Sequence, residues 1–192
     1  MNFESKLGPF TMNYISAGNY KSCCFGLVTL GTQKFENKDN ENLFLARVLL
    51  LWEVHEEVTS KMKHDLNTFP STISKEYTLS WSQSSSLRSD LEAFRGKPFT
   101  NEETRRMDLK SILGNWCNLE ISDFKSSDGN VYSRIKEISF LKNKQKNSLQ
   151  QSVHKLMLFN IHEPDWETYE SLDPYIKERL QKAIEWKNLR KY

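Results

Sequence analysis

The sequence contains little of what marks secreted, fibrous or membrane-embedded proteins. Its 192 residues include only three cysteines, seven glycines and five prolines. Three cysteines, of which Cys23 and Cys24 are adjacent, do not make a disulfide framework and are typical of a reduced cytosol. No apolar run approaches the ~18 residues of a membrane span, and the N-terminal region has no apolar signal segment. We therefore expect a cytoplasmic protein without a membrane partner.

An excess of charge is also missing, because 27 lysines and arginines nearly balance 25 aspartates and glutamates. The balance conceals an uneven distribution along the chain. Residues 125–155 contain seven basic and two acidic side chains, whereas residues 160–175 contain five acidic and no basic ones. This distribution fits two solvated surfaces, and it fits equally a basic binding surface followed by an acidic segment. An acidic segment of this kind would recruit partner proteins or shield the basic surface.

Hydrophobic periodicity predicts five strands, a helical insert and a C-terminal helix. The strands are expected at Tyr20–Leu30, Phe44–Val54, Thr72–Trp81, Trp116–Phe124 and Val131–Leu141, with polar loops such as 33–42 between them. The insert is expected at 84–113, where apolar residues recur at helical spacing and Thr100 with Glu103 forms a capping box. The C-terminal helix is expected at about Ser171–Lys187. Phe44–Val54 also fits a helix, but its short length between polar loops favours a strand.

Five strands with a helix between the third and the fourth is the element order of the OB-fold. The sequence therefore predicts a mainly β (α+β) chain with a five-stranded OB-like barrel at 20–141. A lead-in at 1–19 precedes the barrel, and a basic loop, an acidic segment and the C-terminal helix follow at 142–192. Other five-stranded barrels fit the order almost as well. An OB-like barrel binds oligonucleotides or oligosaccharides on the face of strands 2 and 3 and on the flanking loops.

Motifs for catalysis are weak. The four histidines are scattered, none pairs with cysteine at a zinc-ligand spacing, and the sequence has no phosphate-binding glycine loop or nucleophile elbow. Glu53, Glu120 and Asp123 would suit a metal-dependent nuclease if they gathered, but no spacing requires it. We expect no metal, no cofactor and no enzymatic activity.

Aromatic and basic side chains alternate on two of the predicted strands. Such rings stack the bases of single-stranded nucleic acid, while lysines and arginines follow the phosphates. The predicted nucleic-acid-binding residues are Lys75, Tyr77 and Trp81 on the third strand, Tyr132, Arg134 and Lys136 on the fifth, and Lys142, Lys144 and Lys146 in the basic loop. The alternative is that the aromatic residues, above all Trp52 and Trp81, belong to the core, and that the loop is only solvated.

Several longer motifs follow one another along the chain. They are LGTQ at Leu30–Gln33, LLLWEV at Leu49–Val54, SKEYTLSWSQSSSLRSDLEAFRGKPFT at Ser74–Thr100, LKSILGNWCNLEI at Leu109–Ile121 and LFNIHEPDWETYESLDPYIKERLQKAIEW at Leu158–Trp186. Together they cover roughly residues 17–186. They resemble a family of small tailed-bacteriophage proteins from replication and recombination gene clusters, usually regarded as single-stranded DNA-binding proteins with an OB-like core.

The resemblance implies a sequence-tolerant, non-enzymatic DNA-binding protein that acts in replication or recombination in the cytoplasm of an infected bacterium. Phage or host replication and recombination proteins are then candidate partners, and a homo-oligomer is compatible with it. Two positions depart from the family pattern: Thr29 stands where an acid precedes the leucine–glycine pair, and residues 187–192 are basic where many such proteins end in an acidic tail.

A second interpretation fits the near-neutral charge and the apolar strands equally well. It is a phage-encoded protein-interaction module, an inhibitor or adaptor of a host protein. A metal-dependent nuclease is the third interpretation.

Overall fold

The structure is a computed structural model that describes residues 14–36, 39, 41–55, 70–142 and 151–189. Its elements, in chain order, are β1 (Gly18–Glu36), β2 (Asn42–His55), β3 (Ser71–Thr78), α1 (Ser86–Arg95), α2 (Asn101–Arg106), the 3-10 helix η1 (Leu109–Ile112), β4 (Trp116–Lys125), β5 (Val131–Phe140), β6 (Met157–Asn160), α4 (Trp166–Ser171), α5 (Pro174–Gln181) and the 3-10 helix η2 (Glu185–Asn188). Long strands and short helices make the protein mainly β, as the sequence predicts.

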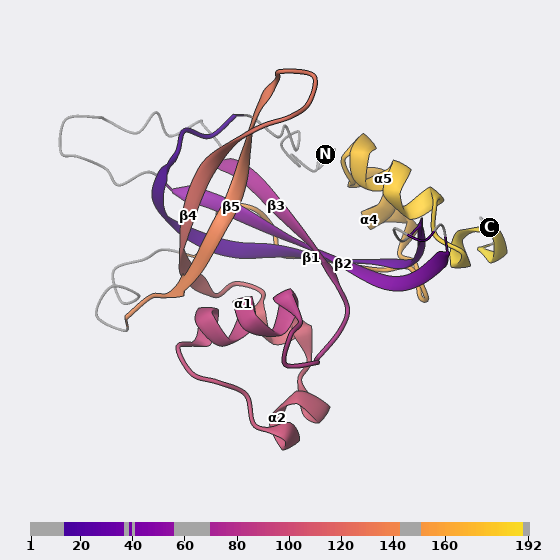
Figure 1. The fold of residues 1–192 in the computed structure, drawn as a ribbon, viewed down its shortest axis with the longest axis horizontal. Coiled ribbons are helices and arrows are strands. Elements are labelled where there is room, and N and C mark those ends of the chain that lie inside the picture. Colours follow the sequence, from indigo (N-terminus) through magenta and orange to yellow (C-terminus); the bar gives the residue numbers. More distant parts are fainter. Residues whose placement is uncertain (1–13, 37–38, 40, 56–69, 143–150, 190–192) are drawn as a thin grey trace, which may run out of the picture.

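The described strands form one open sheet around β1 (Figure 1). Five of them are antiparallel in the order β3-β2-β1-β4-β5, and β6 pairs with β1 in parallel. The helical insert lies between β3 and β4, as predicted. The predicted closed barrel is wrong: within the described residues β3 and β5 come close without pairing, and α1 packs against both of them.

β1 is longer than the sequence predicts, because it continues beyond Leu30 to Glu36. Residues 33–36, expected in a polar loop, pair with residues 42–45 of β2. Backbone hydrogen bonds hold these residues together. Polar side chains are compatible with this pairing because the hairpin is largely exposed here. Register shifts near Gly26 and Gly31 bend the strand. One edge of β1 therefore pairs with β2, while the other pairs first with β4 and then with β6.

β2 is a strand, as predicted, and it supplies two hydrophobic cores from its two faces. Val48, Leu50 and Trp52 belong to a first core shared with β3, β4, β5 and α1. Leu49 and Leu51 belong to a second core on the opposite face. Because side chains alternate along a strand, the part of β2 that is buried on both faces, Val48–Trp52, is apolar at every position.

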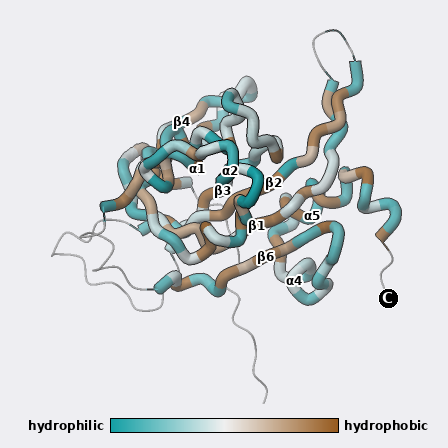
Figure 2. Tube along the Cα trace, turned by 90° about the horizontal axis from the view of Figure 1, so that it is seen from below, coloured by the Kyte–Doolittle hydropathy of each residue, from teal (hydrophilic) through white to brown (hydrophobic). Residues whose placement is uncertain are grey.

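The C-terminal segment forms the other wall of the second core. Figure 2 shows β6 beside β1, with α4 and α5 next to them. Phe159, Ile161, Ile176 and Leu180 are fully buried in this core. Burial of a large apolar side chain contributes about 1.5–3 kcal/mol. The segment is therefore an integral layer of the fold.

The C-terminal helix predicted at Ser171–Lys187 is confirmed only in part: α5 occupies Pro174–Gln181 and the 3-10 helix η2 follows it, while α4 is a separate helix that ends at Ser171. Asp173 begins a new helix by accepting a hydrogen bond from the Tyr175 backbone N–H, and Pro174 occupies the first turn, where a proline needs no hydrogen-bond partner. A proline in the interior of one continuous helix would break it.

The hairpin of β4 and β5 forms as predicted and is the part that carries the candidate site. Its turn is closed by the Ser126 backbone N–H, which donates to the carbonyl of Asn130, and Gly129 adopts a φ of 89° that favours glycine. The Asp128 carboxylate accepts hydrogen bonds from the backbone and side chain of Asn130. Figure 1 shows the tip of this hairpin projecting beyond the rest of the described chain.

Candidate nucleic-acid interface

The aromatic and basic residues predicted on the third strand are engaged in packing. Tyr77 is 1 % exposed, and its hydroxyl donates to Asp90 of α1 at 2.9 Å. Lys75 forms an ion pair with the same carboxylate at 2.6 Å. The Trp81 ring packs edge-on against Phe99, with 5.7 Å between centroids. The prediction that this face meets a ligand is therefore wrong for Tyr77, and burial raises the pKa of its hydroxyl.

The amphipathic character of α1 explains this packing. Leu87 and Leu91 are buried in the first core, one helical turn apart. Ser85 caps the start of the helix, and Gly96 ends it with a φ of 73°. The helix therefore lies on β3 and β5, with its apolar stripe toward the sheet, and it covers Tyr77.

The β2–β3 face expected to bind a ligand is covered as well. Glu76 lies opposite Leu49, so its side chain is on the face of the second core. Its carboxylate forms ion pairs with Arg179 of α5 at 2.6 Å and with Arg47 at 2.8 Å. An oligonucleotide cannot reach this face in the structure.

Glu53 fastens the same face to the segment before β6. The side chain is 0 % exposed. Both of its oxygens are used: Oε1 accepts from His55 Nε2 and Oε2 from His154 Nδ1, each at 3.0 Å, and the backbone N–H groups of Val153 and His154 donate to it too. Burial alone would raise the pKa of Glu53, but the bonds from His154, His55 and the backbone outweigh it and hold the pKa well below its usual range.

The three carboxylates considered for a nuclease site do not meet. Glu53 is buried against two histidines, Glu120 pairs with Lys136, and Asp123 accepts a hydrogen bond from the Tyr14 hydroxyl at 2.9 Å. Within the described ranges, no three histidine, cysteine or acidic side chains are grouped as a metal site would need.

The outward face of the β4–β5 hairpin is the surface that remains open. Tyr132 and Phe124 lie directly opposite each other on it, 51 % and 45 % exposed. Arg134, one position further along this face, holds its guanidinium 5.4 Å from the centre of the Phe124 ring. The sequence alone does not single out Phe124, although counting back from the turn pairs it with Tyr132. We call Phe124, Tyr132 and Arg134 the hairpin-tip cluster.

The charges around the hairpin-tip cluster favour an anion. Lys125, at the tip, and Arg134 are both exposed, and neither forms an ion pair within the part of the chain that the structure describes. The nearest acidic residue of the strand, Asp123, points to the opposite face, where Tyr14 occupies it. Asp128 is used within the turn.

The remaining predicted lysines differ in their surroundings. Lys136 is the extra residue of a β-bulge, and its ammonium group contacts Glu120 Oε1 at 2.6 Å. This hydrogen bond raises the pKa of Lys136. Lys142 is exposed two residues beyond β5, while Lys144 and Lys146 lie outside the described residues.

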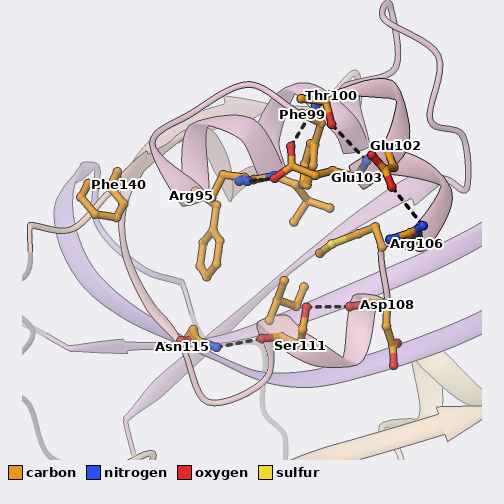
Figure 3. A pocket seen from close by; sticks show the side chains of 14 residues that line it. Arg95, Phe99, Thr100, Glu102, Glu103, Arg106, Asp108, Ser111, Asn115 and Phe140 are labelled. Atoms are coloured by element: carbon orange, nitrogen blue, oxygen red, sulfur yellow. Dashed lines mark hydrogen bonds and ion pairs between the residues drawn. The ribbon is translucent and has the colours of Figure 1, made fainter.

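A groove of about 810 Å³ opens between α1, α2, η1 and the end of β5. Its floor is apolar and includes Leu91, Phe94, Met107 and Ile112. Figure 3 shows charged groups around it that pair with one another, Arg95 with Glu103 and Arg106 with Glu102. Because these charges are paired, the groove offers little to a phosphate backbone.

Most of the acidic segment has local roles. Asp165 caps α4 and Asp173 caps α5, each by accepting a backbone N–H two residues ahead. Glu170 forms an ion pair with Lys177 at 3.4 Å. Carboxylates at helix N-termini are favourable there, so the concentration of acidic residues at 160–175 follows largely from two helix starts.

Comparisons of the chain with models of protein families, with curated proteins and with solved structures find no match. In the described residues, no helix is long and apolar enough to cross a membrane.

Proposed function

We propose that the protein binds single-stranded DNA through the hairpin-tip cluster, without sequence preference and without catalysis. The observation that carries the proposal is the pair of half-exposed rings, Phe124 and Tyr132, beside Arg134, which has no ion-pair partner among the described residues, on a projecting hairpin. Stacking of a base on an exposed aromatic ring contributes about 1–3 kcal/mol.

The two rings have different parts to play. The Arg134 guanidinium already lies over Phe124, so the open ring face belongs to Tyr132. A base stacked on Tyr132 would place its phosphate near Arg134, whose planar donors suit phosphate oxygens. Phe124 then holds Arg134 in position. Stacking and phosphate contacts do not distinguish one base from another, which is why binding should be sequence-tolerant.

The fold supports the proposal at a coarser level. The strand order and the helix between β3 and β4 fit an OB-like arrangement in its partly open form, in which the β4–β5 loop is one of the two ligand-binding loops. The motif resemblance supports a phage protein of replication or recombination, acting in the cytoplasm of an infected bacterium. Replication or recombination proteins would then be its partners.

The test is the affinity for a labelled oligothymidine at about 50 mM salt, measured by fluorescence anisotropy with and without Mg²⁺. We expect binding by the wild type and a loss of about 1–3 kcal/mol in Tyr132→Ala. Tyr175→Ala is the matched control, because Tyr175 is 47 % exposed but lies on α5. Equal affinities of the two variants would contradict the proposed site, and cleavage of the oligonucleotide with Mg²⁺ would favour a nuclease.

The second candidate function is a protein-interaction module, and the groove beside α1 favours it. An apolar floor surrounded by paired charges would accept apolar side chains of a partner protein. This candidate predicts no DNA binding even at low salt. A wild-type protein that ignores the oligonucleotide at about 50 mM salt would replace the first function by the second.

A further inference from the structure

The outward face of the β4–β5 hairpin changes its charge over a few residues. From the tip downward, the cross-strand pairs on this face are Phe124 with Tyr132, Ser122 with Arg134, and Glu120 with Glu137. The first two pairs supply rings and a cation, whereas the third places two carboxylates opposite each other. Like charges in direct opposition repel and are seldom placed so without a compensating group.

Lys136 compensates this acidic pair only in part. It is the bulged residue between the second and third pairs, and its ammonium group contacts Glu120 at 2.6 Å. Glu120, Glu137 and Lys136 together carry a net charge of −1. A phosphate that approached Lys136 would have to displace Glu120 and would still face Glu137.

We infer that a bound strand crosses the hairpin at its tip, over Tyr132 and Arg134, and that Glu120 and Glu137 prevent it from running along β5. This inference rests on the proposed function. It specifies the direction in which the DNA strand crosses the hairpin and how short the binding site is. A strand that crosses the two β-strands, about 4.8 Å apart, meets Tyr132 and Arg134 but none of the charged groups further down β5. The contact is therefore short, with Arg134 as its phosphate ligand on this face.

The salt dependence of binding measures this contact. Each phosphate neutralised on a single strand contributes about −0.7 to the slope of log K against log salt, so the Arg134 contact contributes about −0.7. Lys136→Ala should leave the slope of log K against log salt unchanged and weaken binding less than Tyr132→Ala does, because Lys136 is held by Glu120 and contacts no phosphate.

The decisive variant is Glu120→Gln with Glu137→Gln, which removes the acidic pair and frees Lys136. We expect a slope steeper by about 0.7, which over a twentyfold range of salt amounts to about eightfold tighter binding at the low-salt end. Glu163→Gln with Glu167→Gln is the matched control, since both residues are exposed in the acidic segment and their loss changes the net charge equally. The oligothymidine of the previous experiment is the probe.

If the hairpin double variant binds no more tightly than the control double variant, the inference is overturned while the proposed function stands. A Lys136→Ala variant that loses as much as Tyr132→Ala would also overturn it, because the strand would then run along β5. Failure of the wild type to bind removes the proposed function itself. Loss of one exposed ion pair costs only about 0–1 kcal/mol, so folding should survive these substitutions.

Discussion

β3 and β5 carry nearly the same alternation, Lys75-Glu76-Tyr77 in one and Tyr132-Ser133-Arg134 in the other, and the fold uses them in opposite ways. Tyr77 is enclosed by α1 and the sheet, with Asp90 holding both its hydroxyl and the Lys75 ammonium. Tyr132 stands on a hairpin that projects beyond the rest of the described chain. The same local pattern therefore stabilises the fold in one strand and remains available to a ligand in the other.

The difference comes from the segments that flank each strand along the chain. β3 leads directly into α1, whose apolar stripe must be buried and folds back onto the strand. β5 is preceded by a tight turn and followed, two residues after its end, by chain outside the described residues. Nothing described covers its outward face near the tip.

The largest effect on stability is expected at Tyr77, the tyrosine that α1 covers. Tyr77→Ala removes a buried ring and should lower the free energy of unfolding by about 3–5 kcal/mol, measured by urea denaturation. Tyr77→Phe keeps the ring and loses only the bond to Asp90, which should cost about 1 kcal/mol. Neither variant should change DNA affinity of the folded protein. A folded Tyr77→Phe protein with weakened DNA binding would contradict the assignment of Tyr77 to the core.

Sequence alone predicts which residues share a face of a strand, because alternation is local. It does not predict which face is covered, since that depends on elements folding back from elsewhere. The sequence indicates the burial of Tyr77 only indirectly. Leu87 and Leu91 form an apolar stripe that must pack against a neighbouring strand. The sequence does not predict β6. Its four residues show no alternation of apolar and polar side chains, and they pair with a strand about 130 positions earlier.

One of the motifs that carry the family resemblance, LGTQ, makes contacts between segments that are distant along the chain. In LGTQ, the Thr32 hydroxyl and N–H both donate to Glu185, and the Gln33 side chain donates to the carbonyl of Arg179. Gly31 adopts a φ of 71° beside Ala183, where a side chain would not fit. This motif specifies how the C-terminal segment packs on β1. It specifies contacts within the fold and not contacts with a ligand, so it does not point to Phe124.

A second prediction concerns Glu53, the buried carboxylate that joins β2 to the segment before β6. All groups around Glu53 donate hydrogen bonds to it, so the amide N–H₂ of Glu53→Gln would face donors. A buried donor left without an acceptor costs about 1–3 kcal/mol, so Glu53→Gln should lower the free energy of unfolding by at least that much at neutral pH, measured by urea denaturation.

The pH dependence follows from the depressed pKa of Glu53. A carboxylate with a lowered folded-state pKa stabilises fully above its unfolded value, about 4.3, and the contribution is lost as the pH falls through the folded-state value. The difference in unfolding free energy between wild type and Glu53→Gln should therefore shrink below about pH 4.3. A difference that stays constant from neutral to acidic pH would show that Glu53 is not ionised in the fold.

The smallest effect is expected from the basic loop after β5, at the far end of the open hairpin. Tyr132 and Phe140 are eight residues apart along β5, about 26 Å, and Lys142 lies beyond that end. If a strand crosses the tip, changing Lys142, Lys144 and Lys146 to Ala together should alter the slope of log K against log salt by less than 0.7, roughly one phosphate contact. A flattening of about 2 would mean that all three lysines contact phosphates and that the strand follows the whole hairpin. Base preference should not change in either case, because phosphate contacts position a strand without reading its sequence.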